Sequence, residues 1–413
     1  MSGRALRILI VTHVVTNNDG QGRVNYEIAR AALAAGHHVT LLASKAAPEL
    51  VAHPHACFVR IDASRLPTRL LQYQLFAWRC GAWIRAHRDA FDVVHVNGFI
   101  AWARADVNAV HFVHDGWYRC GFYPFRFLRG PYDAYQVLYT RLNAWCERWA
   151  LRRADTIVPV SEKVAQEVRA VGVGRANLRV IHNGVDVDEF APGASQRARF
   201  ALPQAPFMLL FAGDLRVSRK NLDTVLRALT QTPPHVHLVV AGILRNSPYP
   251  VLAATLGVAQ RVHFTDLVKD MPALMRSVDA FVFPSRYEAM SLVLLEALAT
   301  ALPVVTVRTA GGAEVIGSDC GIVLDQPDDD IALAAAICRL AEHPVDARQM
   351  GDAARELART LSWQTMANRY LALYGEIAAR KGSRRPLPGE YVHEHELDGA
   401  EPSATRTTVV AES

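Results

Sequence analysis

Residues 279–301 have the sequence DAFVFPSRYEAMSLVLLEALATA, in which an apolar run, a polar loop and a second apolar run follow one another. The first run, Ala280–Phe283, is short and closed by Pro284, which is typical of a buried strand. Ser291 is a favoured N-cap residue, and Leu292–Ala299 consists of good helix formers. The free N–H groups and the dipole at such a helix start favour an anion, most often a phosphate. Ser291 and Leu292 are therefore predicted to lie at an anion-binding site.

Two carboxylates flank this predicted helix start. Glu288 lies in the loop, before the cap, and Glu296 lies on the helix, where its Cα–Cβ bond tilts toward the N-terminus. Two acids do not suit a phosphate itself. They suit hydroxyl groups on a molecule that is attached to the phosphate, so we expect a ligand that carries both.

Strand-like and helix-like segments alternate along most of the chain, which predicts parallel sheets covered by helices. The expected strands are residues 6–11, 39–43, 93–96, 109–113, 156–160, 178–181, 208–212, 236–241, 262–264, 280–283 and 304–307. The expected helices are residues 23–35, 70–87, 161–170, 221–230, 251–256, 271–277, 292–299, 330–341, 347–361 and 363–379, with a short helix after Gly312. Residues 117–153 form an aromatic, basic region to which the pattern assigns no element.

The polar segment 182–190, HNGVDVDEF, interrupts this alternation. We therefore expect an N-terminal domain over residues 1–182 and a C-terminal domain over residues 188–361. Both would be Rossmann-like α/β domains. Residues 381–413 are polar and charged without periodicity, and they are predicted to be a disordered tail.

Polar and glycine residues follow the predicted strands at one edge of each sheet. In open parallel sheets, ligands bind beyond the carboxyl ends of the strands. The candidates at these ends are Gly20, Gly22, His114, Gly213, Arg216, Arg219, Lys220 and Glu288. Because they converge on one edge of two sheets, we expect them to share a site.

The composition excludes several other classes of protein. The 413 residues carry a net charge of +5, and no nucleic-acid motif accompanies this mild excess, so we expect no nucleic-acid partner. No run approaches the roughly 20 apolar residues of a membrane span. The N-terminus lacks the features of a signal peptide. The six cysteines are scattered without a C-x-x-C pair, which argues against zinc and disulfides and favours a cytoplasmic protein.

The E-x7-E spacing of Glu288 and Glu296, within RYEAMSLVLLEALA, resembles the signature of the retaining, two-domain (GT-B) glycosyltransferases of family four. The resemblance extends to about Arg380. It implies two facing Rossmann-like domains with a cleft between them, and a last helix, residues 362–380, that crosses back to complete the N-terminal domain. It also implies that Glu288 contacts the donor sugar and that Glu296 holds the ribose of the nucleotide.

Residues 211–222, FAGDLRVSRKNL, resemble the family's G-R-L…K-[GN] segment, whose arginine and lysine grip the diphosphate. Fixed cations stabilise the charge that develops on a leaving diphosphate. Lys220 matches the family's lysine, whereas Asp214 stands where the family has arginine. We expect Arg216 to replace that arginine. The alternative is that Arg216 and Arg219 are solvated loop charges.

His114, in VHDGW, resembles the family's histidine that approaches the donor sugar and the acceptor, although a lone histidine can also be structural. His95 and His111, on strand-like stretches, are expected in the core or as second-layer supports of the site. The stretch 19–22, DGQG, takes the place of the family's Gly-Gly loop, with Asp19 in place of one glycine.

Gly311, in TAGGAE, resembles a glycine-rich turn near the donor sugar, and a purely structural role stays open. We do not interpret Asp186-Val187-Asp188 as a metal motif, because it belongs to an N-G-V-D segment similar to the family's linker. With Lys220, an arginine and a helix N-terminus on the diphosphate, no metal and no other cofactor is expected.

The resemblance implies transfer of a sugar from a nucleotide diphosphate sugar to a glycan or lipid-linked acceptor, with retention explained by attack on the face from which the donor phosphate leaves. We expect a role in envelope or surface polysaccharide synthesis. One alternative is a catalytically silent, sugar-nucleotide-binding scaffold, which Asp214 and Asp19 favour. Another is a GT-B epimerase or phosphorylase.

Aromatic residues and arginines interleave over residues 117–153. Such a mixture suits an anionic lipid surface, which would place the protein peripherally on the inner face of the plasma membrane. The other interpretation is an acceptor-site lid together with helix packing on the domain.

Overall fold

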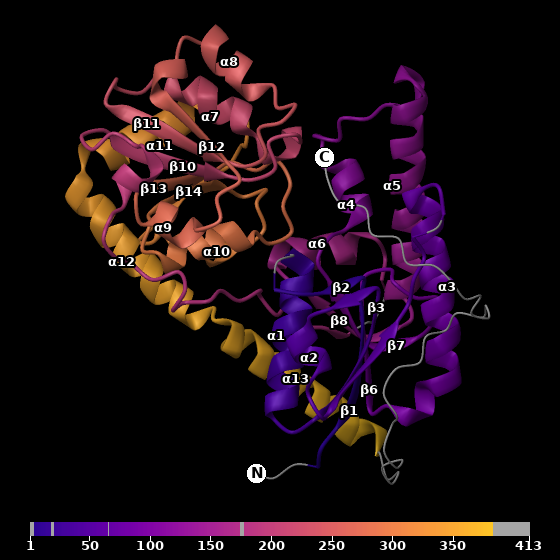
Figure 1. Cartoon of the computed structure of the whole chain (residues 1–413). Helices are drawn as coiled ribbons and strands as arrows, with labels where there is room; N and C mark the ends of the chain where they lie inside the picture. The colour runs from indigo at the N-terminus through magenta and orange to yellow at the C-terminus, as the bar shows by residue number, and fades with distance from the viewer. Residues whose placement is uncertain (1–3, 18–19, 65, 174–176, 383–413) are drawn as a thin grey trace, which may run out of the picture.

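The computed structural model describes residues 4–17, 20–64, 66–173 and 177–382, and it contains two larger sheets, in both of which every strand pair is parallel (Figure 1). The first sheet has the order β5-β3-β1-β6-β7-β8-β9 and the second has the order β12-β11-β10-β13-β14-β15. The first contains β1 (Arg7–Val11), β3 (His38–Ala43), β5 (Ala56–Arg60), β6 (Val93–Asn97), β7 (Ala105–Val110), β8 (Ala154–Pro159) and β9 (Asn177–Leu178). The second contains β10 (Phe207–Ala212), β11 (Val236–Ala241), β12 (Val262–Asp266), β13 (Ala280–Phe283), β14 (Val304–Val307) and β15 (Gly321–Leu324). The predicted pair of parallel α/β domains is confirmed.

Alternation along the strands of the first sheet decides which helices cover each face. Ile8 and Ile10 of β1 point to one core, which contains α1 (Gly20–Ala34) and α13 (Trp363–Lys381). Leu9 and Val11 point to the opposite core, which contains α3 (Arg69–His87). Since successive side chains of a strand face opposite ways, both faces of this sheet are buried under helices.

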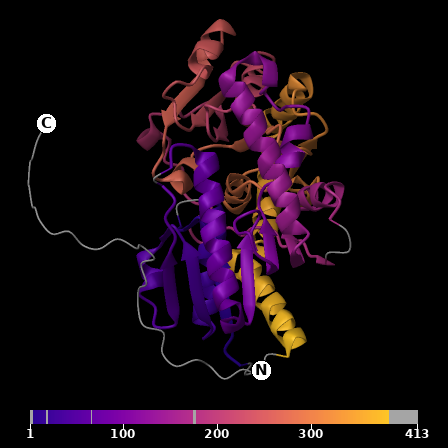
Figure 2. The ribbon, with the colours of Figure 1, turned by 90° about the vertical axis from the view of Figure 1, so that its right-hand side faces the viewer.

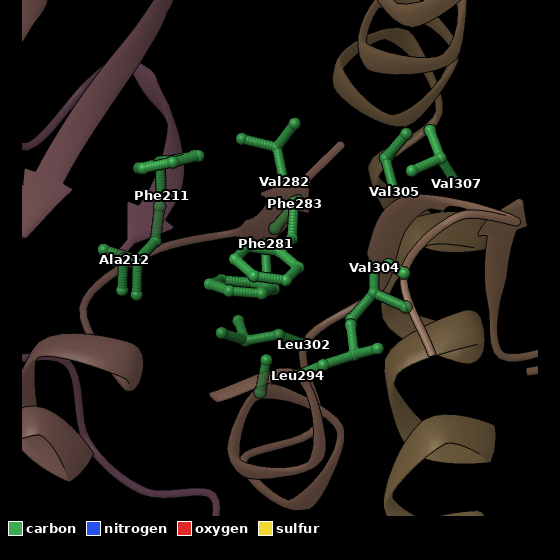
Figure 3. Close-up of a cluster of buried hydrophobic side chains, with 14 of the residues drawn as sticks. Phe211, Ala212, Phe281, Val282, Phe283, Leu294, Leu302, Val304, Val305 and Val307 are labelled. Atoms are coloured by element: carbon green, nitrogen blue, oxygen red, sulfur yellow. The ribbon is translucent and has the colours of Figure 1, made fainter. Parts of the chain in front are cut away.

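The second sheet is buried by continuous apolar strands. All four residues of β13 are fully buried, and Phe281 stacks on Phe283 with ring centroids 5.8 Å apart. Figure 3 shows Phe281 close to Leu294 of α10 (Leu292–Ala299) and to Leu302, which follows that helix. The other helices of this domain are α7 (Leu222–Leu229), α8 (Tyr249–Thr255), α9 (Met271–Met275), α11 (Asp330–Glu342) and α12 (Pro344–Thr360).

The last helix, α13, returns to the first domain, as Figures 1 and 2 show. Ser362 caps it by accepting a hydrogen bond from the Thr365 N–H at 3.1 Å. Tyr370 and Tyr374 are buried in the same core as α1. The predicted crossing helix is therefore confirmed.

The last helix ends one residue beyond the boundary that was predicted between it and the tail. The helix continues through Lys381, whose Nζ lies 2.6 Å from the fully buried Asp106 carboxylate and donates to the Asp92 carbonyl oxygen at 3.0 Å. This ion pair, in which only the carboxylate is fully buried, stabilises the last turn of the helix. Residues 383–413, where the rest of the disordered tail was predicted, lie outside the described residues.

Several elements were missed or misplaced. The helix α5 (Pro131–Leu151) occupies most of the aromatic, basic region to which no element was assigned, and β5 and β15 were also missed. The strand predicted over residues 109–113 is β7, which starts at Ala105. Buried polar residues explain this shift, because Asp106 pairs with Arg88 at 2.6 Å and the Asn108 amide donates to the Gly98 carbonyl oxygen at 3.1 Å.

Candidate functional site

The centre of the candidate site is an ion pair between Lys220, which follows β10, and Glu288, which follows β13. Lys220 Nζ donates to Glu288 Oε2, and the two side chains are only 15% and 14% exposed. Arg219 Nη1 lies 3.7 Å from the other carboxylate oxygen. Burial alone would raise the pKa of Glu288, but the charges of Lys220 and Arg219 hold that pKa below its usual value. The site therefore combines an ionised carboxylate with two cations.

Lys220 is held in place by its neighbour, Asn221, which sequence analysis did not identify. Asn221 is fully buried and adopts a left-handed conformation, with φ of 68°. Its side-chain amide donates to the carbonyl oxygens of Pro284, at 2.9 Å, and Pro327, at 2.6 Å. These bonds tie the end of β10 to the loop after β13, so that Lys220 is presented to Glu288.

The glycine at position 311 has a packing reason. The Gly311 N–H donates to the Glu288 carbonyl oxygen at 2.9 Å, and a Cβ at Gly311 would lie 1.7 Å from the Ala289 carbonyl oxygen. Any larger residue would displace the loop that carries Glu288. Gly311 therefore supports the site by close backbone approach.

His114 begins α4 (His114–Arg119) at the end of the first sheet, and it is paired with a buried carboxylate. Glu147, on α5, accepts from the His114 N–H at 2.8 Å and lies 3.3 Å from its Nδ1. A carboxylate at Nδ1 favours the proton there and leaves Nε2 as the atom able to contact a ligand. Glu147 was missed because it lies on the helix that sequence analysis did not predict. His95 is fully buried, as expected for the core, and contacts Tyr374.

A cavity of about 240 Å³ lies between the two domains. Gly20 comes from α1 in the first domain, and Leu292 and Glu296 come from α10 in the second. The full lining is Asn17, Gly20, Arg23, Gly184, Val185, Asp186, Glu189, Phe190, Leu292, Glu296 and Trp363. Of the predicted residues, Gly20, Leu292 and Glu296 thus meet in one cavity, and Arg23 is a cation that the sequence analysis did not identify.

Glu296 is ionised with difficulty in this cavity. Burial, and to a lesser extent the charge of Glu189, raise its pKa to about 7, while Arg23 acts in the opposite direction.

Asp186 accepts from the N–H groups of Asp188, at 3.1 Å, and Glu189, at 3.0 Å, so its carboxylate shapes the turn between the domains.

Other predicted residues lie at the edge of this arrangement. Arg216 pairs with Asp214 at 2.9 Å, and the two side chains are 51% and 36% exposed. Gly213 lies against the side chain of Lys220, and Gly22 is buried within α1. Ser291 occupies the N-cap position of α10, as predicted, but its side chain makes no capping hydrogen bond. Asp19 lies outside the described residues.

We expect Glu296→Gln to stabilise the ligand-free protein increasingly as pH rises. The folded-state pKa of about 7 exceeds the ordinary value of 4.5, so ionisation of Glu296 costs stability progressively between these values, and fully above pH 7. Thermal denaturation at about pH 5 and about pH 8.5 should show a larger gain in Tm for the variant at the higher pH. The exposed Glu342→Gln is the matched control. An equal gain at both values would contradict the assignment.

The described part of the chain contains no group of three or more His, Cys, Asp or Glu side chains arranged to hold a metal ion. None of its helices is long and apolar enough to cross a membrane.

Comparison with known proteins gives matches along most of the chain. Residues 18–189 match the family model described as Glycosyltransferase Family 4, and residues 206–343 match the one described as Glycosyl transferases group 1. The chain is 34% identical over 264 residues to a glycogen synthase from Mycobacterium tuberculosis, an alignment that covers 61% of this chain and 61% of that relative.

A second relative is the GDP-mannose-dependent α-(1-6)-phosphatidylinositol monomannoside mannosyltransferase of Mycolicibacterium smegmatis. It is 31% identical over 261 residues, which cover 58% of this chain and 67% of the relative. Among solved structures, sucrose-phosphate synthase from Thermosynechococcus elongatus has a TM-score of 0.76 at 22% identity, covering 91% of this chain and all of that one. The likeness to that structure shows a shared two-domain fold.

Proposed function

Since the chain belongs to the family 4, group 1 glycosyltransferases, we propose that it transfers a sugar from a nucleotide diphosphate sugar to a hydroxyl group of a glycan or lipid-linked acceptor. The observation that carries the proposal is the buried Lys220–Glu288 pair beside the start of α10. A cation, a carboxylate and a helix N-terminus at one sheet edge suit a phosphate that bears a hydroxyl-rich group.

In this proposal, the side chains divide the donor between them. Lys220 and Arg219 bind the diphosphate and stabilise the charge that it gains as its bond to the sugar breaks. Lys220 contacts Glu288, so a bound phosphate would compete for Lys220 and leave Glu288 free to accept hydrogen bonds from sugar hydroxyls. Glu296, in the cavity, accepts hydrogen bonds from the hydroxyl groups of the ribose. Because two cations already face the diphosphate, we propose that no metal is required.

We propose the following chemical step. The bond between the anomeric carbon and the phosphate oxygen breaks, and the acceptor hydroxyl forms the new bond on the same face. Its proton passes to the departing phosphate oxygen. His114, presented by the other domain, contacts the donor sugar and the acceptor through Nε2. The anomeric configuration is retained in this proposal.

A panel of nucleotides and nucleotide sugars, read by thermal shift and then by product analysis, tests the proposal. At about 100 Kd a bound donor adds roughly 2.7 kcal/mol of stability. We expect one nucleotide series to stabilise the protein, and the matching donor to give a transferred or hydrolysed sugar with retained configuration by NMR. Binding without turnover would favour the silent scaffold, and an epimerised donor or a sugar phosphate would favour the epimerase or the phosphorylase. Stabilisation by no nucleotide would contradict the proposal.

We further propose that the first domain attaches to an anionic membrane surface near its acceptor. Figure 1 shows α3 and α5 together on one side of this domain, and these helices and the turn before α5 carry exposed apolar side chains. These are Leu71, Trp78, Phe127, Leu128, Tyr132, Leu138 and Trp145. Arg126 and Arg141 are exposed in the same region. Such cations beside apolar side chains favour an interface with anionic lipid, rather than a lid that only covers the acceptor.

We expect the double variant Phe127→Ser, Leu128→Ser to lose binding to vesicles that contain phosphatidylglycerol. Both side chains are exposed, at 62% and 94%, and buried apolar area contributes to attachment. Co-sedimentation should show a fall of about tenfold in the partition coefficient. Val251→Ser, Leu267→Ser, with two 71% exposed side chains in the other domain, is the matched control. Equal binding by wild type to neutral and anionic vesicles would contradict the proposal.

A further inference from the structure

Tyr287 directly precedes Glu288, yet its side chain is enclosed by the opposite domain. The residue is 1% exposed. Its hydroxyl lies 2.9 Å from the Val113 carbonyl oxygen and 2.8 Å from Glu167 Oε2, on α6 (Glu162–Ala170). Both acceptors belong to the first domain, whereas Tyr287 belongs to the second. The hydroxyl therefore forms a polar contact between the domains beside the candidate catalytic glutamate.

The surroundings of the Tyr287 ring are also built by the first domain. Phe112 and Trp117 each place a ring centroid 5.3 Å from it. Lys163 Nζ lies 3.7 Å from the ring centroid and 2.6 Å from Glu167 Oε1. Glu167 is thus fixed by a cation while it faces the Tyr287 hydroxyl. Burial, followed by the charge of Glu167, raises the pKa of Tyr287 well above its usual value, so the hydroxyl keeps its proton and donates.

The Glu167 carboxylate also packs closely against α4. A Cβ at Gly116, in α4, would lie 2.6 Å from the Glu167 carboxyl carbon. The helix that begins with His114 therefore packs its backbone directly against the carboxylate that faces Tyr287. Glu167 contacts both the tyrosine and the helix of the candidate histidine.

Glu288 is flanked by a second bond between the domains. The residue after it, Ala289, accepts a hydrogen bond from Ser161 Oγ at 2.7 Å, and Ser161 is fully buried in the first domain. Both neighbours of Glu288 are thus attached to the domain that carries His114. On the other side, the Val113 carbonyl that faces Tyr287 leads directly into His114.

We propose that Tyr287 is a positioning residue, which sets the distance between Glu288 and His114 through its hydroxyl contact with Val113 and Glu167. The Tyr287 hydroxyl contacts the Val113 carbonyl oxygen, Glu288 follows Tyr287, and His114 follows Val113. One hydrogen bond and two peptide units therefore connect the two candidate catalytic residues across the domain boundary. Catalysis that depends on groups from two domains requires such a constraint, because small displacements of reacting groups cost large factors in rate. The inference rests on the proposed glycosyltransferase function.

Tyr287→Phe, which removes only the hydroxyl, tests this role. We expect kcat for sugar transfer to fall by about tenfold to thirtyfold, while KM for the donor changes by less than about threefold, because the residue acts on the alignment of the two domains and not on the donor. Tyr249→Phe, at a 5% exposed tyrosine within the second domain, measures the general effect of losing a buried hydroxyl. Its kcat should stay near that of wild type.

A second pair of variants keeps the test decisive if Tyr287→Phe is unstable. Glu167→Gln retains an acceptor for the hydroxyl and should keep kcat within about threefold of wild type, whereas Glu167→Ala should lose about tenfold. Unchanged kcat in both Tyr287→Phe and Glu167→Ala would overturn the inference. A loss of kcat in these variants that parallels their loss of Tm, and that Tyr249→Phe shows to the same extent, would overturn it as well. Inactivity of wild type with every donor would instead contradict the proposed function.

Discussion

Replacing Glu288 by glutamine is expected to lower kcat for sugar transfer by a factor of about 10²–10³, the range seen when one preorganised electrostatic group is removed. The carboxylate is nearly buried, and its pKa is held below the usual value by Lys220 and Arg219 despite burial, so it is ionised at neutral pH. The amide has a similar shape but carries no charge. It contacts sugar hydroxyls less strongly and no longer balances the two cations.

The measurement is the initial rate at saturating donor, with donor binding followed by thermal shift. Glu314→Gln provides the control, because Glu314 is also a partly buried carboxylate between the domains, where it accepts from the Glu162 N–H at 2.8 Å. We expect that variant to lose less than about tenfold, since its bonds are structural. Equal losses in both variants, or a Glu288→Gln protein with more than a third of wild-type kcat, would refute the assignment of Glu288.

Replacing Tyr374 by alanine is expected to destabilise the first domain by about 3–5 kcal/mol, the usual range for removing a large buried side chain. Tyr374 lies on α13, is fully buried against the core of β1 and α1, and places its hydroxyl 2.5 Å from His95 Nδ1. Alanine leaves a cavity and an unpaired imidazole nitrogen. Tyr374→Phe removes only the hydrogen bond and should cost about 1–3 kcal/mol.

Tryptophan fluorescence during urea unfolding can assign this effect to a domain. All seven tryptophans lie in the first domain or on α13, at positions 78, 83, 102, 117, 145, 149 and 363. The fluorescence transition should move to lower urea in Tyr374→Ala, whereas Arg369→Ala, on the exposed face of the same helix, should change stability by less than about 0.5 kcal/mol. An unchanged fluorescence transition would show that α13 does not stabilise the first domain.

The segment around Glu288 could be predicted from sequence because its signals are local. A buried strand closed by proline and a capped run of helix formers depend on residues within one short window. The helix α5 lacked such a signal, since its buried residues include Thr140, Asn143 and Glu147. Their burial is possible only through tertiary partners, such as the contact of Glu147 with His114.

The sequence could predict that the candidate site lies at the carboxyl ends of the strands. It could not predict which side chains contact one another there. Lys220 meets Glu288 because Asn221 joins two loops that lie 63 residues apart in the chain. Arg216 was expected at the diphosphate, and that expectation stays a prediction, because the structure pairs Arg216 with the nearby Asp214. The role of Tyr287 depends on how the two domains meet, which no pattern within a single segment encodes.

The return of α13 to the first domain bears on the order in which the protein folds during synthesis. Domains usually fold as units as the chain leaves the ribosome, with the N-terminal one first. Here the face of the first sheet that α1 and α13 share stays only partly covered until residues 363–381 have been translated. The second domain is complete in the nascent chain by then, so the N-terminal domain is expected to be the later of the two to reach its native state. Chaperones that shield exposed apolar surface would act on the part of that face that α13 later covers.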